Sequence, residues 1–217
     1  MTALLAGAVG LVGLIVGVLV NRAAGRFPWA APGSGQVAVR RPVVELGTAV
    51  LFALVAVRFG ASAELPAFLF VAGTGVLLAV IDLQHRLLPN RVIGPSVLGG
   101  AALLLVAAVA EHDWAALVRA VAGAGVLFAV FLVLALISPS GLGMGDVKLA
   151  ALLGLYLGWL GWGAVVVGAA AGFVVQAAVA LTLLAGRRIG LRGELPFGPA
   201  MLVGAALAIG GSPALLL

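Results

Sequence analysis

Two aspartates in this sequence stand beside long apolar segments, where charged side chains are rare. Asp82 ends one such segment, and Asp146 follows a glycine-rich run from Gly141 to Gly145. Two carboxylates that approach each other cannot both ionise readily, so one can act as a base toward water and the other as an acid toward a carbonyl oxygen. The pair is therefore a candidate for aspartic peptidase chemistry.

Each aspartate also has a simpler interpretation, and the sequence leaves both interpretations open. Asp82 can form an ordinary helix pair with Arg86, four positions on. Asp146 can be the N-cap of the helix that follows it, where backbone N–H groups and the helix dipole favour a carboxylate. Glu45 is similarly interpreted as an interfacial charge or a helix-cap partner at a cytoplasmic helix end. The glycines before Asp146 exceed what a cap requires, because they also allow another chain to approach closely.

Other chemistries lack the residues that they need. The chain has no cysteine and two histidines, so we expect no metal site and no cofactor. The glycine-rich run lacks the Gly-Lys-Ser/Thr signature of a phosphate loop, which argues against nucleotide binding. Basic residues occur in small groups between apolar segments, which indicates membrane topology and no nucleic-acid partner.

The composition is that of an integral membrane protein. Of 217 residues, 64% are hydrophobic and 9% are charged, and there are 32 glycines. Soluble globular proteins have about 45–50% apolar residues. Because lipid satisfies no backbone hydrogen bond, long apolar segments without alternating polarity predict helices, so the expected fold class is all-α.

Punctuation by proline, glycine and charge divides the chain into about eight transmembrane helices, of which the sixth is short. The predicted spans are 3–20, 44–60, 65–83, 91–110, 114–137, 146–160, 162–185 and 198–215. Residues 1–217 then form a single polytopic membrane domain, with a short cytoplasmic loop over about 21–42 and a core over about 43–217.

Charge asymmetry predicts the orientation of these spans. When loops are assigned alternately to the two sides, only Arg58 and Arg119 fall on one side, and ten of the 12 basic residues fall on the other. By the positive-inside rule that second side is cytoplasmic, and both aspartates face it. The ten residues are Arg22, Arg26, Arg40, Arg41, Arg86, Arg91, Lys148, Arg187, Arg188 and Arg192.

Three motifs in order resemble those of the bacterial type IV prepilin peptidases, which are membrane aspartic peptidases of the GxGD type. They are Asp82 in Ile-Asp-Leu-x-x-x-x-Leu-Pro, Gly143-Met144-Gly145-Asp146, and Leu195-Pro196-Phe197-Gly198-Pro199. The resemblance covers about residues 43–205. It implies the GxGD peptidase architecture and a multi-pass protein of the bacterial inner membrane, surrounded by lipid, with its active site at the cytoplasmic side.

The resemblance also implies a reaction and its residues. The reaction is cleavage of the basic leader from type IV prepilins or pseudopilins after a glycine, with Asp82 and Asp146 as the catalytic pair. Lys148 and the turn from Pro196 to Pro199 also match family positions, but the resemblance assigns them no role. The candidate substrate-binding or loop-shaping residues are Gly143, Gly145, Lys148, Pro196, Phe197, Gly198 and Pro199.

The loop over 21–42 departs from the pattern of bifunctional family members. Those members carry a longer loop with two Cys-x-x-Cys pairs and also N-methylate the new pilin N-terminus. The cysteine-free loop here cannot hold that zinc site, which disfavours N-methylation, although Asn21, Arg26 and Pro28 are retained. Two alternatives to the peptidase stay open: an ion- or proton-coupled transporter that uses the same aspartates, and a noncatalytic assembly scaffold.

Overall fold

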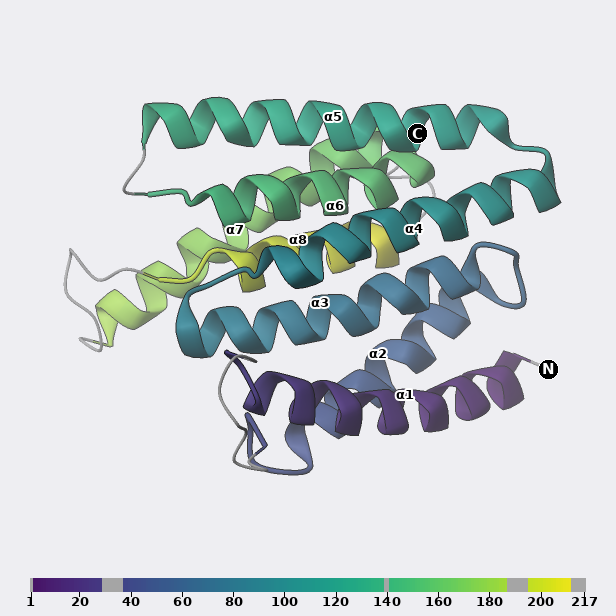
Figure 1. The fold of residues 1–217 in the computed structure, drawn as a ribbon, viewed down its shortest axis with the longest axis horizontal. Helices are drawn as coiled ribbons and strands as arrows, with labels where there is room; N and C mark the ends of the chain where they lie inside the picture. The colour runs from purple at the N-terminus through teal and green to yellow at the C-terminus, as the bar shows by residue number, and fades with distance from the viewer. Residues whose placement is uncertain (1, 29–36, 139–140, 187–194, 212–217) are drawn as a thin grey trace. The chain divides into compact units, whose positions relative to one another are not determined.

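The computed structural model describes residues 2–28, 37–138, 141–186 and 195–211 (Figure 1). This part of the chain forms eight α-helices and no strand, so the all-α prediction is confirmed. The helices are α1 (Thr2–Gly25), α2 (Val43–Phe59), α3 (Leu65–His85), α4 (Asn90–Glu111), α5 (Trp114–Ile137), α6 (Met144–Leu160), α7 (Trp162–Ala185) and α8 (Gly198–Gly210).

Five of these helices, namely α1, α3, α4, α5 and α7, are long and apolar enough to cross a membrane by length and composition. Helices α2 and α6 have 17 residues each, and α8 has 13. The predicted end of the last span and the basic residues Arg187, Arg188 and Arg192 lie outside the described residues.

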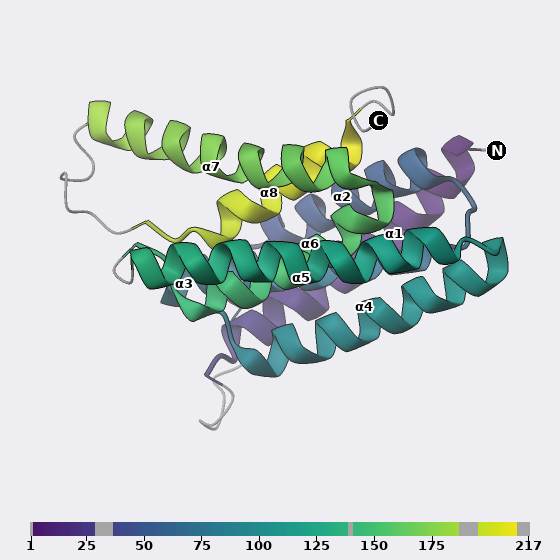
Figure 2. The same cartoon turned by 90° about the horizontal axis from the view of Figure 1, so that it is seen from above.

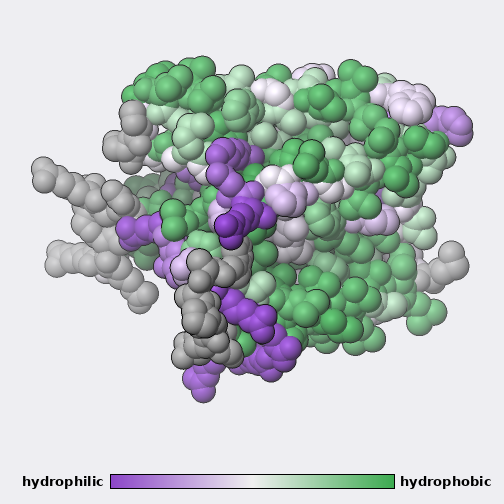
Figure 3. Space-filling model, in the orientation of Figure 1, coloured by the Kyte–Doolittle hydropathy of each residue, from purple (hydrophilic) through white to green (hydrophobic). Residues whose placement is uncertain are grey.

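Large apolar side chains cover much of the exterior. Leu4 in α1 is 80% exposed and Ile137 in α5 is 75% exposed. Figure 3 shows hydrophobic side chains over the visible parts of α1 and α5. An exterior of this kind is stable against lipid and unfavourable against water, so the protein is a multi-pass membrane protein.

The helices group into two compact units. The first comprises residues 1–87 and 98–112, and the second comprises residues 88–97 and 113–217. Helix α4 is therefore shared, because its beginning belongs to the second unit and its remainder to the first.

In the first unit, α1, α2 and α3 pack against one another. The last turn of α1, the first turn of α2 and the last turns of α3 meet in an apolar cluster that includes Val20, Val44 and Ile81. The first unit therefore brings the end of α3, which carries Asp82, beside the ends of the loop between α1 and α2.

In the second unit, α5 packs on α6 at close range, and α7 lies beside α8 (Figure 2). A Cβ atom on Gly123 would lie 2.6 Å from the carbonyl oxygen of Gly154, so these two helices touch through their backbones. Small residues permit such contacts between membrane helices. Gly161 alone separates α6 from α7 and has φ 141°, a conformation that favours glycine.

Candidate active site

Asp82 is a buried residue in the last turn of α3. It is 4% exposed, and its neighbour Ile81 is 0% exposed. Helix α3 ends at His85, because Arg86 takes a left-handed conformation with φ 52° and donates its backbone N–H to the Asp82 carbonyl oxygen at 2.8 Å. The side chain of Asp82 is thus enclosed by protein, and a helix pair with Arg86 is compatible with this burial.

A polar network that the sequence interpretation missed lies in the same unit as Asp82. The Asn21 amide nitrogen donates to the Val39 carbonyl oxygen, and the Val39 N–H donates to the Asn21 amide oxygen, both at 2.9 Å. Asn21 also donates to Glu45 Oε1 at 3.2 Å, and Arg41 Nε lies 3.5 Å from the same oxygen. Glu45 is 5% exposed, so it is a buried member of a network and not the expected interfacial charge.

Helix α3 joins this network through the residues that follow Asp82. The Gln84 side chain donates to the Ala38 carbonyl oxygen. The His85 ring lies 5.0 Å from the Phe27 ring, centroid to centroid. Residues 38 and 39, which precede α2, are thus held by side chains from α1 and α3.

Asp146 lies in the first turn of α6, in the second unit. The helix begins at Met144, two residues before the predicted start, and Gly143 is its N-cap. Asp146 is therefore the third helical residue and not the N-cap. Its Oδ2 accepts the backbone N–H of Gly143 at 3.0 Å. This bond satisfies one backbone donor at the helix start and fixes the carboxylate beside the positive end of the helix dipole.

The segment that begins α4 contacts the first turn of α6 on both sides of Asp146 in sequence. A Cβ atom on Gly145 would lie 2.9 Å from Leu88 Cβ, so only glycine fits there without a shift. Lys148 Nζ donates to Asn90 Oδ1 at 2.8 Å. Gly143 differs from Gly145, because the nearest atom to a Cβ there would be Asp146 Oδ2 at 3.6 Å, an ordinary contact.

The Pro196–Pro199 turn leads into α8, and its phenylalanine is packed among aromatic rings. Phe197 is the N-cap of α8 and is 8% exposed. Its ring centroid lies 5.1 Å from that of Phe173 and 6.1 Å from that of Phe131. These contacts fit a loop-shaping position, because they fix the start of α8 against α5 and α7.

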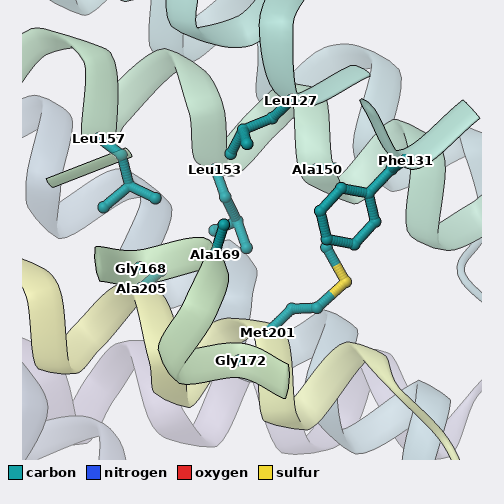
Figure 4. A pocket seen from close by; sticks show the side chains of 10 residues that line it. All are labelled: Leu127, Phe131, Ala150, Leu153, Leu157, Gly168, Ala169, Gly172, Met201 and Ala205. Carbon is teal, nitrogen blue, oxygen red and sulfur yellow. The ribbon is translucent and has the colours of Figure 1, made fainter. Parts of the chain in front are cut away.

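A small pocket lined entirely by apolar side chains and glycines lies between α5, α6, α7 and α8 (Figure 4). In Figure 4 the Met201 side chain points toward the Phe131 ring. The pocket offers no group for acid–base chemistry. Across the described ranges, no three His, Cys, Asp or Glu side chains form a cluster that could hold a metal ion.

The structure thus groups Gly143, Gly145, Asp146 and Lys148 around the start of α6, and it places Phe197, Gly198 and Pro199 at the start of α8 in the same unit. Asp82 belongs to the other unit, and its pairing with Asp146 stays a prediction.

The comparisons with known proteins agree on one family. Residues 65–211 match the model of the type IV leader peptidase family. A protein of Bacillus subtilis named prepilin leader peptidase/N-methyltransferase is 36% identical over 179 residues, which is 80% of this chain and 66% of the relative. A protein of the same name from Pseudomonas putida is 32% identical over 80% of this chain and 59% of the relative. The chain thus spans less than two thirds of the length of these relatives, and no solved structure matches it significantly.

Proposed function

Because the chain belongs to the type IV leader peptidase family, we propose that it is a membrane aspartic endopeptidase that removes the leader of type IV prepilins or pseudopilins. Asp82 and Asp146 are the proposed catalytic pair, and the cut follows a glycine at the cytoplasmic face of the bacterial inner membrane. The observation that carries the proposal is the fixed carboxylate of Asp146, held by the Gly143 N–H at the start of an apolar helix. The family match favours this hydrolase over a transporter.

In the proposed reaction, one carboxylate takes a proton from water while the water oxygen bonds to the carbonyl carbon of the scissile peptide. The other carboxyl group donates its proton to the carbonyl oxygen, which gives a tetrahedral diol. Collapse of the diol breaks the carbon–nitrogen bond, and the leaving nitrogen takes the proton that the first carboxyl group holds. The second carboxylate takes a proton from one diol hydroxyl as the new carbonyl forms, so both carboxyl groups regain their starting forms.

The covalent chain supports an approach of the two aspartates. Six residue steps lead from Asp82 to Leu88, and six extended residues span at most about 20 Å. Leu88 packs on Gly145, the residue before Asp146. We therefore propose that the two units act as one membrane domain, with one aspartate from each.

The basic residues support the proposed cytoplasmic side. Arg22 lies in the last turn of α1, and Arg41 pairs with Glu45 in the first turn of α2. These two turns lie at the same end of the first unit as Asp82. In the second unit, Lys148 lies two residues after Asp146. Basic residues mark the cytoplasmic ends of membrane helices.

Co-expression with a prepilin tests the proposal. Mass analysis of the pilin N-terminus is expected to show leader removal by the wild type and none by Asp82→Asn or Asp146→Asn. Asp113→Asn is the matched control, because Asp113 caps α5 by accepting the Ala116 N–H at 2.8 Å and an asparagine keeps that bond. Cleavage by either site variant at the rate of the control contradicts the catalytic pair.

The same mass spectra test whether the new pilin N-terminus is methylated. Those relatives are named as N-methyltransferases as well as leader peptidases. We propose that this chain lacks the methyl transfer, because the loop over 21–42 holds no cysteine. A methylated mature N-terminus in the wild-type sample, absent without the enzyme, contradicts this proposal.

A further inference from the structure

The beginning of α4 is fastened to the first turn of α6 by one polar and one apolar contact. Lys148 Nζ donates to Asn90 Oδ1 at 2.8 Å, and the Leu88 side chain covers Gly145. Leu88 is also the residue at which the chain enters the second unit. The two contacts therefore hold the point where the chain arrives from the helix that carries Asp82.

The position of Asn90 is well defined by the backbone around it. The Pro89 carbonyl oxygen accepts the N–H groups of Val92 at 2.9 Å and of Ile93 at 3.1 Å, which closes the first turn of α4. Asn90 is the first residue of that helix. An amide oxygen on a closed turn is a fixed target for the flexible ammonium group of Lys148.

The hydrogen bond is exposed, which limits what it contributes to stability. Exposed charged contacts contribute little to folding, because water competes for both partners. Its location is more informative than its strength. Lys148 lies two residues after Asp146, and Asn90 lies one short connection after the end of the Asp82 helix.

We propose that Lys148 and Asn90 are positioning residues for leader cleavage: their hydrogen bond holds the connection that follows Asp82 on the helix that carries Asp146. The inference rests on the proposed function, because it takes those aspartates as the reacting pair. Neither residue touches the reacting atoms in this scheme. Loss of the bond lets the connection move and reduces the fraction of molecules with both carboxyl groups in place.

Kinetics with the purified full-length chain and a prepilin provide the first test. Lys148→Met and Asn90→Leu are each expected to lower kcat about tenfold with KM nearly unchanged, and the double variant is expected to be no worse than either single variant. Asn90→Asp keeps the acceptor and is expected to retain most activity. Arg91→Gln is the matched control, because it removes a charge from the adjacent exposed position.

Three kinetic results would overturn the inference. They are full activity in Lys148→Met, additive losses in the double variant, or an effect on KM alone. Where Lys148→Met or Asn90→Leu accumulates poorly in the membrane, Lys148→Arg and Asn90→Asp are the conservative replacements. Each is expected to be more active than the variant that removes the hydrogen bond at the same position.

Cross-linking separates this inference from the proposed function. The chain has no cysteine, so Asp82→Cys/Asp146→Cys introduces the only two thiols. Thiol-reactive linkers of increasing length are expected to join them, and adding Lys148→Met is expected to lower the yield several-fold with the shortest effective linker. No cross-link at any length in the parent pair contradicts the proposed catalytic pair. Equal yields with and without Lys148→Met contradict the positioning role alone.

Discussion

The backbone N–H of Gly143 donates to Oδ2 of Asp146 at 3.0 Å. The group proposed to do chemistry is thus the group that closes the first turn of its own helix. The backbone closes the same turn, because the Asp146 N–H also donates to the Gly143 carbonyl oxygen at 3.0 Å. Two hydrogen bonds between these residues therefore orient the carboxylate.

Two replacements of Asp146 are expected to differ in their effect on stability but not in their effect on cleavage. An asparagine can still accept the Gly143 N–H, whereas an alanine cannot, so Asp146→Ala is expected to be less stable than Asp146→Asn by about 1 kcal/mol. Thermal unfolding in detergent measures the difference. Both variants are expected to lack cleavage, and equal unfolding temperatures would contradict the helix-start role.

The two glycines of the GxGD motif are expected to respond differently to the same change. At Gly145, serine places a Cβ atom 2.9 Å from Leu88 Cβ, so Gly145→Ser is expected to lower the free energy of unfolding by about 1–3 kcal/mol. At Gly143 the N-cap position has φ −87° and ψ 158°, and serine is a preferred N-cap, so Gly143→Ser is expected to be neutral or stabilising. Thermal unfolding of the two variants checks the order, which a reversal would refute.

The Asn21 network is expected to make a large contribution to stability. Asn21→Ala removes two hydrogen bonds to Val39 and one to the buried Glu45 carboxylate, so we expect a loss of about 2–4 kcal/mol. Thr48→Val is the control, because the Thr48 hydroxyl is equally buried but donates only to Val44 in its own helix.

Limited proteolysis gives a second measurement for this network. Cleavage between residues 29 and 42 is expected to be faster in Asn21→Ala than in Thr48→Val, because the two side-chain hydrogen bonds to Val39 are lost. Equal cleavage rates in the two variants would show that the hydrogen bonds from Asn21 to Val39 do not restrain the loop.

The contact between α5 and α6 offers a matched pair of glycines two residues apart. Gly123→Ala places a methyl group against the Gly154 backbone, whereas a Cβ atom on Gly125 has no atom within 4 Å. We expect Gly123→Ala to lose about 1–3 kcal/mol and Gly125→Ala to lose nothing. Thermal unfolding measures both, and a stable Gly123→Ala variant would mean that the two helices can separate without cost.

Much of the fold follows from local sequence. The bounds predicted for 114–137 and 162–185 agree with α5 and α7, because charge, glycine or a cap residue marks both of their ends. The start of α6 was predicted two residues late, because apolar character identifies a span but capping decides its first turn. Helix α8 ends at Gly210, earlier than the predicted limit of the last span.

The candidate site was less predictable than the helices. Local motifs single out Asp82 and Asp146, because each interrupts an apolar segment. The bonds from Asn21 to Val39 and from Lys148 to Asn90 join residues 18 and 58 positions apart, and no local pattern encodes such pairs. The burial of Glu45 was not predicted for the same reason, since its partners Asn21 and Arg41 come from outside its own helix.

The hold of Asn21 on Val39 has an evolutionary consequence. Because one side chain ties α1 to the residues just before α2, the distance between these two ends does not depend on the length of the peptide between them. A folded module gained or lost between α1 and α2 is therefore expected to leave the contacts between these two helices unchanged. A reporter protein inserted there by engineering is expected to be tolerated for the same reason.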